Sequence, residues 1–369
     1  GPIGAPFGDA PTTWKVYRSV DGRSWDNGTD TSSRSMQIAL NDGETAYFRV
    51  AAVNNGGISF SSETLVYEQP EGAEVPVLIV SAFDRLQTSS LFWTSAGSVG
   101  SVKRMDLRRI NAFDSIIETS SALEAQGYPF ASISQEELAD VDLSSYQVLI
   151  WIAGEESTQD ESFSDSEQEI IRSFIENGGK MIVSGAEIFW DLDQQGSSSD
   201  KAFATEILGA SLDNDDAETY RADGEDLLAG ISMNFSFEQG APYNVEWPDS
   251  LNSPHRVIAR YDTGSVAGIL TDSVATFGFP LELILSEEER VALFSRLLRH
   301  FMPDFEDRPD DSEPDDPVVS EPSEEGNEEE DTAEEIVVEE KRGCFGDRQT
   351  SFSATDYTIR QSFLFYISW

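Results

Sequence analysis

The stretch VLIWIAGEESTQDESFSDSEQEIIRSFIENGGKMIV, residues 148–183, decides the fold of this chain. It begins and ends with short apolar runs, at 148–152 and 181–183, which are typical of strands buried on both faces of a parallel sheet. Between these runs, Ser164 and Glu167 have the spacing of a helix-capping box, and Asn177-Gly178-Gly179 is a helix-stop signal. The stretch therefore predicts a strand, a helix and a second strand. The helix should bury one apolar side, formed by Ile170, Ile171, Phe174 and Ile175.

The same alternation extends along residues 71–302. Further apolar strands are expected at residues 77–80, 266–270 and 274–279. Strands that alternate with helices indicate a doubly wound α/β domain with a mostly parallel sheet, of the flavodoxin or glutamine-amidotransferase kind.

Helix signals fall between these strands. Asn111 is expected to cap a helix that ends at Gly127, and Ser286 with Glu289 opens a last helix near residue 302. Both helices should be amphipathic, because their apolar residues recur at helical spacing. The expected inner residues are Phe113, Ile116, Ile117 and Leu123 in the first helix, and Val291, Phe294, Leu297, Leu298 and Phe301 in the last.

Residues 1–70 have a different character and predict β-structure. A strand rich in aromatic and β-branched residues is expected at 14–18, and Met36, Ile38 and Leu40 alternate as in a strand with one buried face. Turn signals rich in Asn, Asp and Gly separate these segments from strands at 47–53 and 61–67. Short strands at this spacing favour a β-sandwich.

These segments resemble a fibronectin type III module. The matching pieces are WKVYRSVDGRSW (14–25), AYFRVAAVNNGG (46–57) and SSETLVYE (61–68). The resemblance implies that the first strand here corresponds to the third of the module, so the module is expected to be truncated, with its first strands upstream of Gly1. The position of the module's tyrosine corner holds Ala46, with Tyr47 beside it.

Residues 76–302 resemble class I glutamine-amidotransferase-like domains. The stretch GEESTQDESFSDSEQEIIRSFIENGGKMIVSGAEIFWDLD (154–193) is similar, more narrowly, to domains of large exported bacterial proteins labelled xanthan-lyase-like or N-acetylmuramoyl-alanine amidase-like. Those proteins often carry fibronectin type III modules. The resemblance implies a secreted or cell-surface location.

The composition is strongly acidic. The 369 residues carry a formal net charge of -45, which argues against a nucleic-acid partner, and no apolar run is long enough to span a membrane. Residues 303–340 hold 19 acids and one base, so a disordered acidic linker is expected over 303–342. Residues 343–369 form a C-terminal tail that is either a sorting tail or the product of a frame error. Cys344 is the single cysteine, which excludes a cysteine cluster for zinc.

Polar residues follow three of the expected strands. In open α/β sheets, ligands bind at the carboxyl ends of the strands, so these residues should converge on one edge. They define a candidate pocket, whose expected members are Asp84, Glu155, Glu156, Ser184, Glu187, Trp190 and Asp191.

The resemblance to amidotransferases also implies which residues a catalytic member would need. Active amidotransferases need a thiol nucleophile in a turn after a strand, and a histidine that takes its proton. Here the corresponding strand exit holds Ser184, and Phe279 stands where the imidazole is expected. The two histidines, His255 and His300, are better explained as surface residues, the latter in the last turn of a helix. We therefore expect no catalytic residues and no cofactor.

Other chemistries are weighed against structural explanations. Glu155 with Glu187 has the residue types for acid–base cleavage of a glycoside, although solvent-exposed or capping roles are favoured. Asp191 and Asp193 have the spacing of the first and third ligands of an EF-hand, but Gln195 and Ala202 stand at its fifth and twelfth positions, which leaves a looser cation site open and any metal unknown. Four tryptophans have rings that can stack on sugars, and strand tryptophans such as Trp151 are expected to be core: Trp93, Trp151, Trp190 and Trp247.

The sequence thus favours a non-catalytic accessory or structural region. Its expected partners are a cell-wall glycan, another polysaccharide or cations. The alternative is a hydrolase that acts through a missing upstream domain or through the carboxylates of the α/β domain.

Overall fold

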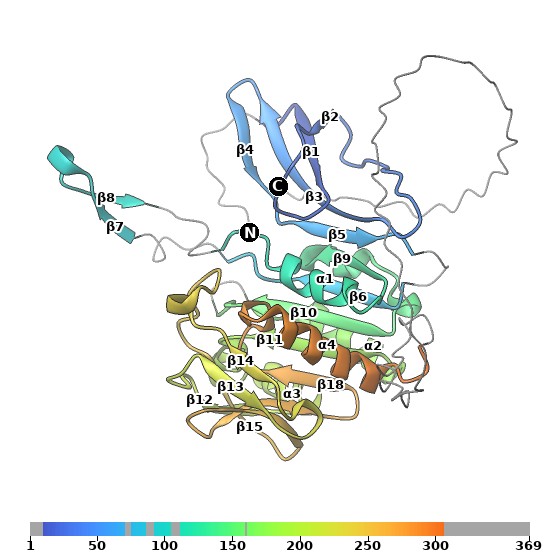
Figure 1. Cartoon of the computed structure of the whole chain (residues 1–369), viewed down its shortest axis with the longest axis vertical. Coiled ribbons are helices and arrows are strands. Elements are labelled where there is room, and N and C mark those ends of the chain that lie inside the picture. The colour runs from blue at the N-terminus through green and yellow to red at the C-terminus, as the bar shows by residue number, and fades with distance from the viewer. Residues whose placement is uncertain (1–9, 71–74, 86–91, 105–110, 159–160, 306–369) are drawn as a thin grey trace, which may run out of the picture. The chain divides into compact units, whose positions relative to one another are not determined.

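The computed structural model describes residues 10–70, 75–85, 92–104, 111–158 and 161–305, and all structural statements concern these residues. A parallel sheet forms the centre of the α/β part, with its strands in the order β9-β6-β10-β11-β18 (Figure 1). The mostly parallel sheet expected from the sequence is therefore confirmed. The parallel strands are β6 (Val77–Ser81), β9 (Phe130–Ser134), β10 (Val148–Gly154), β11 (Lys180–Gly185) and β18 (Val274–Phe277).

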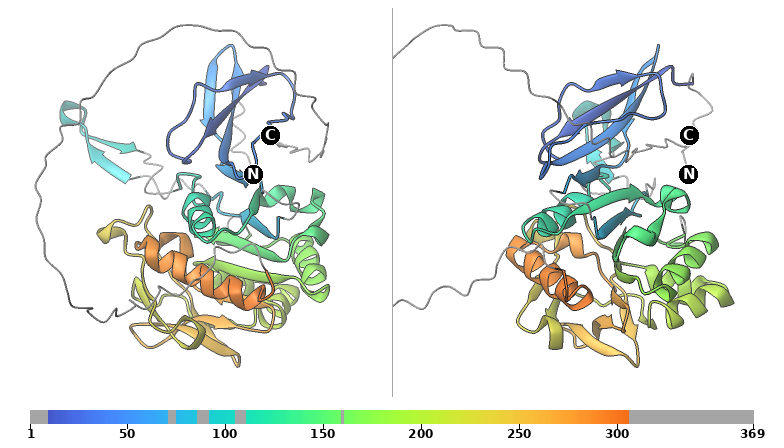
Figure 2. Two further views of the ribbon diagram at one scale, coloured as in Figure 1. Left: turned by 45° about the vertical axis from the view of Figure 1, so that its right-hand side comes forward. Right: turned by 90° about the vertical axis from the view of Figure 1, so that its right-hand side faces the viewer.

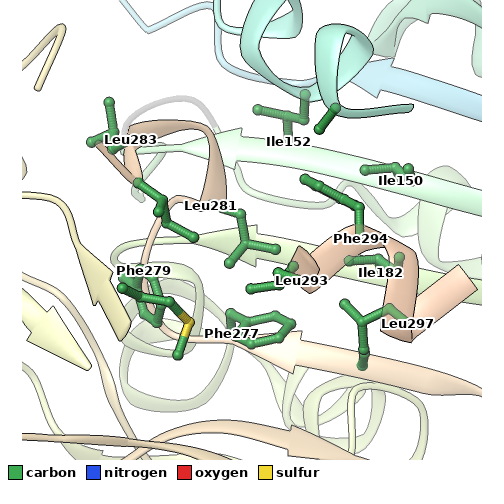
Figure 3. Packing of buried hydrophobic residues seen from close by; sticks show 14 of the residues in the cluster. Ile150, Ile152, Ile182, Phe277, Phe279, Leu281, Leu283, Leu293, Phe294 and Leu297 are labelled. Carbon is green, nitrogen blue, oxygen red and sulfur yellow. The ribbon is translucent and has the colours of Figure 1, made fainter. Parts of the chain in front are cut away.

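Helices cover both faces of this sheet, which explains why its strands are apolar on both sides (Figure 2). Residues of β6, β10 and β11 alternate between two buried clusters. One cluster contains α1 (Ile116–Glu124) and α4 (Glu287–Phe301), and the other contains α2 (Asp165–Glu176) and α3 (Ser198–Glu206). Figure 3 shows how Leu293, Phe294 and Leu297 of α4 pack against Ile150, Ile182 and Phe277 of the strands.

The helix ends test the capping predictions. Ser164 and Glu167 form the expected capping box at the start of α2, and the Ser286 hydroxyl accepts a hydrogen bond from the backbone N–H of Glu289 at the start of α4. The predicted cap at Asn111 is wrong, because α1 begins at Ile116. The Asn111 amide instead donates to the backbone oxygen of Phe83 at 2.8 Å.

Antiparallel strands extend the sheet beyond β18. They come from residues 211–270, and they include the strand that the sequence predicted at 266–270. The predicted strand at 274–279 ends earlier, at Phe277. The added strands are β12 (Ser211–Asn214), β13 (Arg221–Gly224), β14 (Ser232–Asn234), β15 (Ser250–Asn252), β16 (Arg256–Tyr261) and β17 (Val266–Leu270).

The N-terminal strands lie in one antiparallel sheet that continues into the central sheet. The link is β5, in which Tyr67 pairs with Ala131 of β9 and the backbone N–H of Val66 donates to the Ser132 hydroxyl. The Tyr47 hydroxyl lies 3.1 Å from the Ser120 hydroxyl of α1. The strands are β1 (Thr13–Ser19), β2 (Thr29–Thr31), β3 (Thr45–Asn54), β4 (Gly57–Ser61) and β5 (Leu65–Glu68).

The alternating segment at residues 36–40 is not a strand, contrary to the sequence prediction. Met36, Ile38 and Leu40 still pack, partly buried, against a small cluster that includes Trp14 and Phe48. Apolar alternation therefore identified the buried side chains but not the backbone conformation.

Short elements complete the described chain. The strands β7 (Phe92–Ser95) and β8 (Ser101–Arg104) form a separate hairpin, and none of the described helices is long and apolar enough to cross a membrane. The acidic linker and the C-terminal tail expected from the sequence lie outside the described residues. The short helices are Gly97–Val99, Gln135–Asp140, Leu143–Ser145, the π-helical turn Trp190–Gln195, Asp226–Leu228, Phe237–Gln239 and Leu281–Leu283.

Candidate functional site

The strand order places a topological switch point between β6 and β10. The chain passes from β6 to β9 on one side and then returns to β10 on the other side. Such a point opens the carboxyl ends of two adjacent strands to a ligand. The residues that follow β6, β10 and β11 therefore meet at one edge, as the sequence predicted.

Glu156 joins the loops that follow β6 and β10. Its side chain is 2% exposed, and one oxygen, Oε1, accepts hydrogen bonds from the backbone N–H groups of Asp84 at 2.8 Å and Arg85 at 2.6 Å. Gly154 just before it has a φ of +55°, and a Cβ there would lie 2.2 Å from the Phe83 ring. The close approach of these loops thus requires glycine at position 154.

Arg85 connects the exits of β10 and β11. Its Nη1 donates to the backbone oxygen of Glu155 at 2.6 Å and lies 3.3 Å from Oε2 of Glu187. Both side chains are largely buried, with exposed fractions of 16% for Arg85 and 8% for Glu187. Arg85 follows Asp84 in the segment after β6. The sequence analysis expected Asp84 at the site but did not predict that Arg85 would link Glu155 and Glu187.

Glu187 occupies a strained turn. It has a φ of 60°, in the left-handed region, and it lies between the end of β11 and the helical turn that leads into Trp190–Gln195. This conformation costs a non-glycine residue about 1–2 kcal/mol. Burial raises the pKa of Glu187, and the Ser157 hydroxyl and Arg85 act in the opposite direction. The contacts of the Glu187 side chain with Arg85 and Ser157 hold the backbone in this strained conformation.

Ser184, by contrast, lies within β11. It pairs with Ile152 and Phe277 in the sheet and is 2% exposed. The sharp turn after the strand is at Glu187, so the structure puts a carboxylate rather than Ser184 at this turn. Phe279 is fully buried among aromatic rings and stacks on Phe235 with centroids 4.5 Å apart.

Glu155 borders the same edge. Burial raises its pKa to about 8, opposed by the backbone N–H of Glu246, which donates to it, and by Arg85. A carboxyl group with this pKa holds its proton at neutral pH and acts as a hydrogen-bond donor as well as an acceptor.

Two further buried acids lie at this edge and were missed in the sequence. Asp249 is fully buried, its Oδ2 accepts from the backbone N–H of Phe189 at 2.8 Å, and burial raises its pKa well above the usual range. Glu282 accepts a hydrogen bond from the Tyr243 hydroxyl at 2.7 Å. Asp249 precedes the short strand β15, and Glu282 lies in the helical turn Leu281–Leu283 that follows β18, so neither was among the residues expected directly after a strand.

Asp191 and Trp190 lie in the π-helical turn. Asp191 is 8% exposed and accepts from the backbone N–H of Ser162 at 2.8 Å, while the Trp190 side chain is half-buried. The hydrogen bond of Asp191 therefore orders the loop before α2, and its contacts differ from those of Glu155 and Glu187. Among the described residues, no group of three or more His, Cys, Asp or Glu side chains is arranged to hold a metal ion.

Both histidines lie at the opposite edge of the sheet. His255 precedes β16, which runs in the same direction as β18 because both pair antiparallel with β17, so the start of β16 lies at the amino edge. His300 is in the last turn of α4, and its pKa is lowered by burial and by Arg256 and Lys180, which begin β16 and β11. Neither imidazole is placed to act on Glu187 or Ser184.

The tryptophans separate into core and surface. Trp151 is fully buried and stacks on Phe163 at 4.6 Å, which confirms the expected core role. Trp93 and Trp247 are exposed, at 67% and 40%. Trp247 follows Glu246, the residue bonded to Glu155, so of the two exposed rings it is the one near the candidate site.

No protein-family model and no curated protein matches the chain. Among solved structures it is similar to a β-galactosidase from the psychrophilic Marinomonas ef1, at a TM-score of 0.37 and 10% identity, over 62% of this chain but only 29% of the enzyme's chain. It is also similar to a glutamine amidotransferase from Thermotoga maritima, at a TM-score of 0.36 and 12% identity, over 62% of this chain and 99% of that one. At TM-scores below 0.5, these two likenesses imply neither a fold family nor an activity for this chain.

Proposed function

We propose that this chain is a non-catalytic binding region of a secreted or surface-attached bacterial protein that acts at the cell envelope or on polysaccharide. The observation that carries the proposal is that Glu187 occupies the turn after β11 and that its side chain contacts Arg85 and Ser157. Amidotransferase-like enzymes hold a nucleophile in the turn after a strand, whereas this turn holds a carboxylate tied to Arg85 and Ser157. The ion pair of Glu187 with Arg85 holds together the loops that follow β6 and β11. Loops held in one conformation favour ligand binding because less conformational entropy is lost when the ligand binds.

The N-terminal strands support the same proposal. The order β2-β1-β3, with β4 and β5 both on the far side of β3, agrees with one sheet of a fibronectin type III module. Such modules commonly accompany binding and structural regions of exported multidomain proteins. As part of the proposal, we assign residues 1–70 to a truncated fibronectin type III module.

A hydrolase is the second candidate, because one observation favours it. Burial raises the pKa of Glu155 to about 8, so the group keeps a proton at neutral pH, as a general acid must. The Glu187 carboxylate contacts Arg85, whose Nη1 also donates to the backbone oxygen of Glu155. The two carboxyl groups would then be the acid and base of a glycoside-cleaving site.

One experiment separates the two candidates. The whole chain is assayed on glutamine, acyl esters and cell-wall glycans beside Glu155→Gln, Glu187→Gln and the control Glu169→Gln, an exposed residue of α2. The binding proposal expects no turnover and a glycan-dependent rise in Tm. Turnover that is lost in Glu155→Gln or Glu187→Gln and kept in Glu169→Gln would establish the hydrolase instead.

A further inference from the structure

Two exposed aromatic side chains flank the Glu155–Glu246 contact. Trp247 is 40% exposed and follows Glu246 directly, and Tyr220 is 38% exposed. The segment that carries Tyr220 runs beside the one that carries Trp247, because the backbone N–H of Ala217 donates to the backbone oxygen of Pro248 at 2.9 Å. Glu155 and Glu246 lie within electrostatic reach of the Tyr220 hydroxyl. We call these four residues, Tyr220, Trp247, Glu155 and Glu246, the aromatic–acidic patch.

The patch lies at the carboxyl edge of the sheet. The backbone N–H of Glu246 donates to the side chain of Glu155, the residue that follows β10 at the switch point. Two more acids, Asp216 and Glu238, lie within electrostatic reach of the Tyr220 hydroxyl. Exposed rings and several carboxyl groups are therefore concentrated at the edge of the sheet where open α/β folds bind ligands.

The chemistry of the patch selects a ligand with flat apolar surfaces and positive charge. Trp and Tyr faces attract ammonium groups and also cover the apolar faces of rings. The surrounding acids repel anions, and the formal net charge of -45 extends that repulsion over the whole chain. Acidic polysaccharides are therefore poor partners for this surface.

We propose that the aromatic–acidic patch binds a glycan built of amino sugars with free, protonated amines. The sugar ring packs on Trp247 and Tyr220, and its ammonium group is held by Glu246 and the neighbouring acids. This inference rests on the proposed binding function and adds the substrate class. A polymer with one amine on each ring meets Glu246 and the neighbouring Asp216 and Glu238 at once, and its hydroxyl groups find partners in the protonated Glu155 carboxyl group and the Tyr220 hydroxyl.

The test measures binding of a glucosamine tetramer to the whole chain by calorimetry, beside an N-acetylglucosamine tetramer, a galacturonate tetramer and tetralysine. We expect Trp247→Ala to weaken glucosamine-tetramer binding about tenfold, and Tyr220→Ala or Glu246→Gln to weaken it severalfold. The acetylated tetramer should bind about tenfold more weakly, and the galacturonate tetramer should not bind.

Matched controls separate the patch from general attraction to an acidic protein. Trp93→Ala removes an exposed tryptophan elsewhere, and Glu169→Gln removes an exposed charge of α2, so both should leave the affinity unchanged. Trp247→Ala keeps every charge, so its effect reports contact with the ring.

Three results would overturn the inference: equal affinity for both glucosamine tetramers, equal affinity for tetralysine, or equal losses in Trp93→Ala and Trp247→Ala. Equal affinity for the acetylated sugar would leave the proposed binding function intact. Turnover of a glycan would refute that function instead.

Discussion

Glu282 is the clearest test of how burial controls charge in this domain. Its side chain is 2% exposed, Oε1 accepts a hydrogen bond from the Tyr243 hydroxyl, and Oε2 has no partner among the described residues. Burial raises its pKa from 4.5 to about 7, against the opposite effect of the bond from Tyr243. The folded protein therefore holds a proton on Glu282 at pH values where the unfolded chain has released it.

The size of the effect follows from linkage. A tenfold change in proton affinity corresponds to about 1.4 kcal/mol, so a pKa raised from 4.5 to about 7 makes the ionised form about 3 kcal/mol less favourable in the folded state. Below pH 4.5 the group is protonated in both states and imposes no such penalty. As pH rises toward 7 the unfolded state gains by ionisation, and the free energy of unfolding falls by that amount.

Glu282→Gln removes this titration and keeps an oxygen that accepts from Tyr243. The free energy of unfolding in urea is measured at pH 5, 6.5 and 8 for the natural chain and for the variant. Relative to the natural chain, the variant should gain about 2–3 kcal/mol between pH 5 and pH 8. Other titrating groups cancel in this comparison, and Glu169→Gln should run parallel to the natural chain because Glu169 is exposed.

The reasoning fails if Glu282→Gln and the natural chain lose stability in parallel between pH 5 and pH 8. It also fails if the variant is the less stable of the two by a growing margin as pH rises. Either result would mean that Glu282 is ionised in the folded state at neutral pH.

Three further predictions concern the backbone around the site. Gly154→Ala should lower the free energy of unfolding by about 3 kcal/mol, because a Cβ would lie 2.2 Å from Phe83 at a φ of +55°; an unchanged urea midpoint would contradict this. Ser164→Ala should cost about 1 kcal/mol by removing the cap of α2, while Ser173→Ala in the exposed interior of the same helix should cost nothing, and equal losses would disprove the capping role. Glu187→Gly should be about 1 kcal/mol more stable than Glu187→Ala, because both lose the carboxylate and only glycine readily adopts a φ of 60°; the reverse order in thermal unfolding would remove the case for strain.

The parts of the fold that were predictable depend on local signals. The buried strands β10 and β11 consist of uninterrupted apolar residues, and the helix between them carries its own start and stop residues. By contrast β9 reads FASIS, and its Ser132 hydroxyl donates to the backbone oxygen of Val66 in β5, so the burial of this strand depends on a partner far away in the sequence. The strands β12 to β15 are short and lie among turns, which leaves no periodicity to detect.

The candidate site was predictable only where it follows the strands. Glu155, Glu156 and Glu187 were found because each follows a strand that the sequence identified, and the sheet brings these strand ends together. Asp249 and Tyr220 come from the poorly patterned segment 211–252, and their place at the site depends on how that segment folds back. The sharp turn at Glu187 was missed for a different reason, since a positive φ at glutamate is set by its contacts and has no sequence signal.

The buried acids also change how the formal charge of -45 should be understood. That figure counts every carboxyl group as ionised, yet burial raises the pKa of Glu63 and Glu155 to about 8 and that of Glu282 to about 7. The folded domain therefore carries less negative charge near neutral pH than its composition states. At Glu155 two effects oppose each other as pH rises toward 8: ionisation strengthens attraction for a cationic ligand, but it also places an unfavourable charge in a buried position. A pH profile of ligand binding at the aromatic–acidic patch thus has to be compared with a profile of stability, because only a change in affinity at constant stability reports on the ligand itself.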